Sequence, residues 1–175
     1  RHLTIYEDDA TFEPGTDQRL TAIETHLDTR DNWDIFSGLL TDLHPDARVT
    51  GVSTAAGEEF IELDSVIGMV FGIYSRHGLR ILASFEFEGN DTAVHTIDRW
   101  LERQNPRTLT VMPPLAAHDE NLTSTLWPAD NYQIASKIRD SIKRLEAKRV
   151  AFSMRRVEPA AQVVNVDDHG GGGRV

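Results

Sequence analysis

The sequence contains no cysteine among its 175 residues. This absence excludes disulfide bonds, thiolate nucleophiles and cysteine-ligated zinc, and it argues against a disulfide-stabilised secreted module. No apolar run approaches the roughly 20 residues that a membrane-spanning helix needs, and the first residues lack the layout of a signal peptide. We therefore expect a cytoplasmic protein that does not associate with membranes.

Familiar catalytic motifs are also missing. The run from His169 to Gly172 superficially matches the oxyanion loop of some lipases, but the short segment that follows cannot hold the nucleophile elbow that this motif requires. The same glycines precede no helix that could bind a phosphate group. We therefore expect no cofactor and no metal, and the lack of a catalytic signature favours a protein that is not an enzyme.

Charge is distributed unevenly along the chain, which carries a net charge of −10. Residues 1–136 contain 9 basic and 23 acidic side chains, whereas residues 137–156 contain 8 basic and 2 acidic ones. Such an asymmetry between segments is a hint about partners. The pattern predicts an acidic body that carries one basic element.

The basic element coincides with the most regular helical pattern in the sequence. Ile134, Ile138, Ile142 and Leu145 share one helical face, which predicts a helix over residues 131–149. The candidate partner-binding residues are the cations on this helix and just after it: Lys137, Arg139, Lys143, Arg144, Lys148, Arg149, Arg155 and Arg156. They could contact phosphates or an acidic protein surface. They could equally complement the helix dipole and pair within the helix.

The most apolar part of the sequence predicts an antiparallel hairpin. Residues 66–75 and 79–88 alternate at a period of two, and a three-residue loop ending at Gly78 would join them. Glycine suits the positive φ at the bulge of such a loop. In this register Phe71 and Phe85 lie on the same face. We expect this hairpin to form the centre of the sheet.

Shorter patterns predict the remaining elements. Further strands are expected at residues 2–7, 49–54, 59–64, 108–112 and 150–157. Helices are expected to begin at Thr16, at Asp31 and at Asn90 or Asp91, the second of them burying Trp33, Phe36, Leu40 and Leu43. This order indicates an α+β fold with an antiparallel sheet and helices mainly on one face, ferredoxin-like in outline (βααβββ(β)αβ plus a C-terminal helix and strand).

The predicted elements define one domain and one tail. Residues 1–157 form a single α+β domain, in which residues 113–130 are expected to be a surface loop. Residues 158–175 are rich in proline, alanine and glycine and are expected to be a flexible tail.

Two groups of polar residues could bind a metal, although each has a simpler interpretation. His118, Asp119, Glu120 and Asn121 are adjacent, and adjacent side chains rarely reach the same ion, so they fit a solvated loop. A carboxylate cluster of Asp64, Glu86 and Glu88 would suit a metal-dependent hydrolase or nuclease. However, alternation places the two glutamates on the solvent face of a strand, and no lysine accompanies them.

We expect a non-enzymatic protein-interaction or assembly subunit. Its acidic body would meet the basic element of a neighbouring subunit or of a protein partner, so that a homo-oligomer is one outcome. The strand-like run of residues 162–166 could add to a sheet edge. A nucleic-acid-binding protein that uses the basic helix and a metal-dependent hydrolase remain as alternatives.

Overall fold

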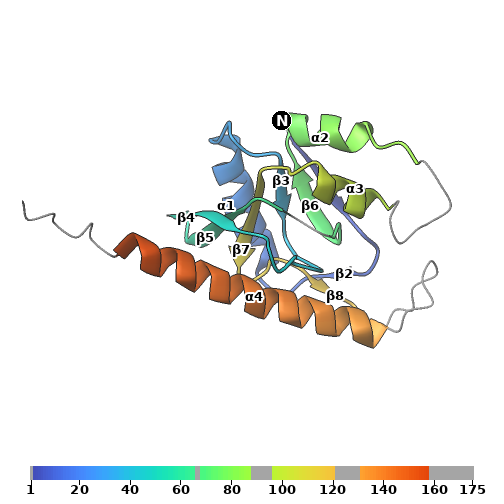
Figure 1. Cartoon of the computed structure of the whole chain (residues 1–175). Coiled ribbons are helices and arrows are strands. Elements are labelled where there is room, and N and C mark those ends of the chain that lie inside the picture. Colours follow the sequence, from blue (N-terminus) through green and yellow to red (C-terminus); the bar gives the residue numbers. More distant parts are fainter. Residues whose placement is uncertain (1, 66–67, 88–95, 121–130, 158–175) are drawn as a thin grey trace, which may run out of the picture.

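A computed structural model describes residues 2–65, 68–87, 96–120 and 131–157, with side chains from residue 134 onward in the last stretch (Figure 1). Its elements in chain order are β1 (Leu3–Tyr6), β2 (Ala10–Thr11), α1 (Thr16–Asp28), β3 (Ile35–Ser37), β4 (Val49–Ala55), β5 (Glu58–Leu63), β6 (Phe71–Tyr74), α2 (Arg76–Ala83), α3 (Ile97–Arg103), β7 (Thr108–Met112), β8 (Ala117–His118) and α4 (Asn131–Val157).

A six-stranded sheet forms the centre of the molecule, in the order β1-β6-β3-β7-β5-β4. All neighbouring strands run antiparallel except β3 and β7, which are parallel. The short strands β2 and β8 pair separately as a second, antiparallel sheet. The expected α+β class with a mostly antiparallel sheet is therefore confirmed.

Both faces of the sheet carry a hydrophobic core. Consecutive strand residues alternate between two clusters, so Phe36 and Phe60 belong to one and Ile35 and Ile61 to the other. Helix α1 packs on the first cluster, α2 and α3 pack on the second, and α4 contributes to both. Figure 1 shows α2 and α3 side by side, with α4 crossing the molecule away from them. This arrangement corrects the expectation of helices mainly on one face, because strands such as β3 and β6 are buried on both faces.

The expected central hairpin is wrong. Strand β6 ends at Tyr74, and the chain then enters helix α2 where a loop and a second strand were predicted. Ser75 caps this helix, since its hydroxyl accepts a hydrogen bond of 3.1 Å from the N–H of Gly78. Phe85 follows the helix, and its ring centre lies 5.8 Å from that of Trp100. No strand pairing therefore places Phe85 beside Phe71.

The helix expected from Asp31 is also wrong in conformation, although its burial is confirmed. Trp33, Phe36, Leu40 and Leu43 are all buried, as their spacing indicated. However, residues 35–37 form β3, which lies between β6 and β7 in the sheet. A central strand forms backbone hydrogen bonds with the strands on both sides. These bonds favour the strand conformation of residues 35–37 more than the helical spacing of their apolar side chains favours a helix.

Helix α4 is longer than the sequence indicated. It continues to Val157, so the strand expected at residues 150–157 is wrong. Helix formation is cooperative, so a helix that is already anchored by buried Ala135, Ser141 and Leu145 readily extends through the following residues. The start expected for the third helix and the tail of residues 158–175 lie outside the described residues.

The segment expected as a surface loop is more structured than predicted in the part that the structure describes. Leu115 and Ala116 are buried, and Ala117 and His118 form β8. The pairing of β8 with β2 holds these residues beneath the N-terminus of α1 and beside α4, where they line a pocket. This local arrangement positions the candidate site.

Candidate functional site

Several of the candidate partner-binding cations on α4 contact acceptors in their own chain. The contacts are Arg139 with Glu120 at 3.1 Å, Lys143 with Asp140 at 3.8 Å, Arg149 with Glu59 at 3.4 Å, Lys148 with the carbonyl of Pro45 at 2.5 Å, and Arg144 with the carbonyl of Leu43. Most of these contacts hold α4 against the sheet and the loop before β4. Docking of a partner on these cations stays a prediction.

The C-terminal end of α4 is different. Arg155 and Arg156 have no ion pair among the described residues, and the guanidinium of Arg156 lies 5.2 Å from the ring centre of Phe152. Met154 is exposed in the same turn, at 66%. This end of the helix therefore presents cations together with apolar surface. Lys137, near the start of the helix, also has no ion pair among the described residues.

The structure does not place the proposed carboxylate cluster along a strand, as the alternating pattern had predicted. Asp64 accepts hydrogen bonds from the backbone N–H and the Nε of Arg48, both at 2.7 Å. Burial alone would raise the pKa of Asp64, but these bonds outweigh it and lower the pKa. Glu86 lies beyond the end of α2, not on a strand, and Glu88 lies outside the described residues. Within the described part of the chain, no three His, Asp or Glu residues gather closely enough to hold a metal.

A buried pair of polar residues lies where β2 and β8 meet. The Nε2 of His118 is 3.0 Å from Oδ2 of Asp9, and the side chain of His118 is only 6% exposed. Neither Nδ1 of His118 nor Oδ1 of Asp9 has a hydrogen-bond partner among the described residues, and both atoms are closed to solvent. An unmatched buried polar atom costs about 1–3 kcal/mol. Such atoms call for a functional or structural reason.

His118 of this pair lines a pocket of about 450 Å³ between the N-terminus of α1, the segment around β8 and α4. The walls are mainly apolar and come from Pro14, Leu39, Pro113, Pro114, Leu115, Ala116, Ala117, Ala135, Ile138 and Ile142. The polar lining residues are Glu13, Thr16, Arg19, His118, Glu120 and Arg139. The volume and this mixture of surfaces are typical of a small-molecule site.

One polar wall of the pocket is rigid. Arg19 donates to both carboxylate oxygens of Glu58 at 2.8 Å, and its remaining N–H groups reach the carbonyls of Pro113 and Pro114 at 2.8 and 3.0 Å. The hydrogen bonds to Glu58 raise the pKa of Arg19. Arg19 therefore fixes α1 to the loop that follows β7, and the carboxylate of Glu58 compensates the positive charge of Arg19.

A second pair of charged residues in the pocket lining is more exposed. Arg139 and Glu120 form an ion pair whose side chains are 48% and 55% exposed. Exposed pairs of this kind contribute only about 0–1 kcal/mol. The guanidinium of Arg139 lies at the same pocket as the buried His118.

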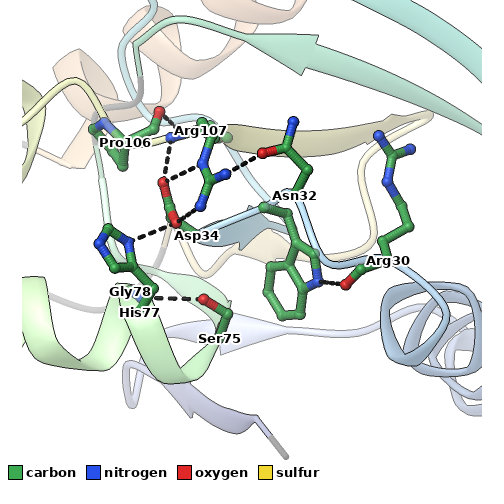
Figure 2. A network of polar contacts seen from close by, with 10 residues as sticks. Arg30, Asn32, Asp34, Ser75, His77, Gly78, Pro106 and Arg107 are labelled. Carbon is green, nitrogen blue, oxygen red and sulfur yellow. Dashed lines mark hydrogen bonds and ion pairs between the residues drawn. The ribbon is translucent and has the colours of Figure 1, made fainter.

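A second polar network lies at the other side of the molecule (Figure 2). Asp34, which is 3% exposed, accepts three hydrogen bonds from Arg107: from the backbone N–H at 2.9 Å, from Nε at 3.0 Å and from Nη2 at 2.6 Å. Nδ1 of His77 lies 2.8 Å from Oδ1 of the same carboxylate. Arg107 also donates to Asn32. The network joins β3, β7 and α2, so we interpret it as a structural clamp.

The sequence had singled out His118 and Glu120 as possible metal ligands, with a solvated polar loop as the simpler interpretation. It gave no signal for Asp9, Arg19 or Asp34, because their partners are distant in the chain and meet only through the pairing of strands. When a single acidic residue precedes an apolar run, the local sequence does not show whether its carboxylate is buried or solvated.

Comparisons of the chain with models of protein families, with curated proteins and with solved structures gave no match. No helix in the described part of the chain has the length and hydropathy to cross a bilayer.

Proposed function

We propose that the protein binds a small, mainly apolar molecule with one acidic group in the pocket between α1, β8 and α4. The observation that carries this proposal is the pocket of about 450 Å³, whose mainly apolar lining also includes Arg139 and the buried His118. Ligand sites typically have volumes of about 300–1,000 Å³ and combine apolar walls with a few converging polar groups.

The charges at the pocket favour a single acidic group on the ligand. Arg139 forms an ion pair with Glu120 at the pocket, and a guanidinium group can bind a ligand carboxylate or sulfonate in the same way. The nearby carboxylates of Glu13 and Glu120 would repel a ligand with several negative charges.

The rigid side of the pocket supports binding in a different way. Because Arg19 is anchored by Glu58 and two carbonyl groups, the wall formed by α1 and residues 113–114 is already in place before a ligand enters. A preformed wall lowers the entropy cost of association.

Filling the pocket with a larger side chain is expected to abolish ligand binding. Ala135 is 2% exposed and lines the pocket, so Ala135→Leu places three additional carbon atoms in that space while keeping a strong helix former. Anilinonaphthalene sulfonate is a suitable probe because it combines aromatic rings with one anionic group. We expect its affinity, measured by fluorescence titration, to fall at least about tenfold.

The matched control is Ala147→Leu, an exposed position on the same helix. This variant should bind the dye like the wild type, and urea unfolding should show that both variants are folded, because loosely packed proteins also bind this dye. Equal dye affinities for the two folded variants would exclude the pocket as the binding site.

The interaction or assembly role expected from the sequence is a second candidate function. The observation that favours it is the exposed end of α4, where Arg155 and Arg156 accompany an exposed Met154. A basic surface with an apolar centre fits the acidic body of another subunit. Lys143 and Arg144 are less suitable for testing the idea, since Arg144 contacts the carbonyl of Leu43 and its reversal would disturb the fold.

We expect light scattering to report association at low salt that weakens as the ionic strength rises. The double substitution Arg155→Glu and Arg156→Glu should return the protein to a monomer, because it places like charges opposite an acidic surface. If the protein is a strict monomer at low salt, with or without residues 158–175, self-assembly is ruled out as its function.

A further inference from the structure

The outer edge of β1 has backbone groups that point away from the sheet. β1 is the terminal strand on its side of the described sheet and pairs with β6 in a fixed register, Leu3 opposite Tyr74 and Tyr6 opposite Phe71. Just beyond the strand, the N–H of Glu7 donates to the carbonyl of Val70 at 2.9 Å. Hydrogen-bonded and non-hydrogen-bonded pairs alternate in an antiparallel ladder. Thr4 and Tyr6 therefore direct their N–H and C=O groups outward.

The side chains along this edge are unusually apolar for an unprotected strand. Leu3 and Tyr6 are 50% and 62% exposed, and neighbouring Phe12 is 45% exposed. The ring of Tyr6 stacks on that of Phe71 with their centres 6.4 Å apart, and the rings of Phe12 and Tyr6 meet edge to face with their centres 6.0 Å apart. Natural edge strands usually carry lysine, proline or a bulge that prevents pairing. The sequence of β1, Leu-Thr-Ile-Tyr, has none of these.

Negative charge accumulates at the end of the same strand. β1 leads directly into Glu7, Asp8 and Asp9. Burial raises the pKa of Glu7, and the carboxylates of Asp9, Asp98 and Asp8 raise it further. These carboxylates repel one another, so a cation that bound among them would be favoured. The exposed aromatic faces beside them attract guanidinium groups.

We propose that β1 binds an extended basic segment of a partner protein, which adds one strand to the edge of the sheet. The outward backbone groups of Thr4 and Tyr6 would hydrogen-bond the segment, as in other cases of strand addition. Its side chains alternate between faces. Those on the face of Tyr6 would be arginines that contact the aromatic rings, and those on the face of Leu3 would be apolar. This inference does not depend on the ligand pocket.

The test uses a fluorescein-labelled octapeptide of alternating arginine and valine, titrated with the full chain and followed by anisotropy. We expect binding that weakens as salt increases. Backbone N-methylation of one alternate set of residues should weaken binding at least about tenfold, because it removes the N–H groups that face β1. Methylation of the other set should have little effect. If the two methylated peptides bind equally, charge attraction alone is at work and strand addition is excluded.

A pair of variants tests the location. Tyr6→Ala should weaken peptide binding about fivefold to tenfold, given the usual strength of a cation–π contact. Phe87→Ala is the matched control, because Phe87 is an aromatic residue that is 61% exposed and belongs to the segment after α2. The urea midpoint of each variant shows that it is folded. An equal loss in both variants, or a dimer that the peptide does not dissociate, would overturn the proposal, the dimer by assigning the edge to a second copy of the chain.

Discussion

Replacing Asp34 by alanine is expected to lower the free energy of unfolding by about 3 kcal/mol, the lower end of the range for breaking a buried ion pair. The substitution removes the acceptor for the backbone N–H and the guanidinium of Arg107, and the contact with His77. The backbone N–H, whose hydrogen bond to Asp34 is partly buried, would then lose its acceptor, which is costly. The guanidinium itself is 48% exposed and can reach water, so the loss stays below the largest values for such pairs.

The matched control for Asp34→Ala is Asp46→Ala, because the side chain of Asp46 is 93% exposed. This control should change stability by no more than about 0.5 kcal/mol. Urea denaturation followed by tryptophan fluorescence measures both. Equal losses in the two variants would show that the network in Figure 2 does not clamp β3 to β7 and α2.

The pH dependence of stability provides a second measure of the same network. Burial alone would raise the pKa of Asp34, but hydrogen bonds from Arg107 and the contact with His77 outweigh it, so the pKa lies below the ordinary value of 3.8. A carboxylate whose pKa is lowered by folding stabilises the protein above its unfolded pKa, and that contribution is lost as the pH falls through the folded pKa. Wild-type stability should therefore decrease below about pH 4, and less steeply in Asp34→Ala.

Local patterns were sufficient for those elements whose sequence and packing agree. Helix α1 lies where it was expected, although Gly15 and not Thr16 is its N-cap, β4 and β5 form the expected pair of strands, and α4 follows the spacing of its isoleucines. The burial of Trp33 and Phe36 was also predictable, because large apolar side chains leave water whatever backbone carries them. Their conformation was not, since it depends on the strands that pair on each side of β3.

Helix α2 shows why a period of two was misleading. Leu79, Ile81 and Leu82 all pack against the second core, and Leu79 and Leu82 are three residues apart, as on one helical face. Over so few residues, alternation and helical spacing give overlapping patterns. The cap at Ser75 favours the helix over a strand. This cap was not recognised in the sequence, because basic residues follow the serine.

The candidate pocket was beyond local inference for a related reason. Its polar groups come from α1, from the segment around β8 and from α4, and each has partners far away in the chain, such as Arg19 with Glu58. His118 alone looks like a loop residue. It becomes a candidate site residue only because β2 and β8 pair and bring it to Asp9.

Replacing Gly78 by alanine is expected to destabilise the protein by about 2–3 kcal/mol, although alanine is the better helix former by about 1 kcal/mol. A Cβ at this position would lie 2.1 Å from the backbone oxygen of Asp34 and 2.9 Å from its carbonyl carbon. Because these are backbone atoms of a buried segment, no change of rotamer relieves the overlap, and α2 must move away. That movement would also stretch the hydrogen bond of 3.0 Å from the N–H of Ser75 to the same oxygen.

The control for Gly78→Ala is Arg80→Ala, an exposed position on the same short helix. It should change the free energy of unfolding by less than about 0.5 kcal/mol. Because α2 carries His77, its displacement should also disturb the contact with Asp34, so Gly78→Ala and Asp34→Ala together should cost less than the sum of their separate effects. A gain of stability in Gly78→Ala would mean that helix propensity dominates and that α2 does not approach β3 as closely as described.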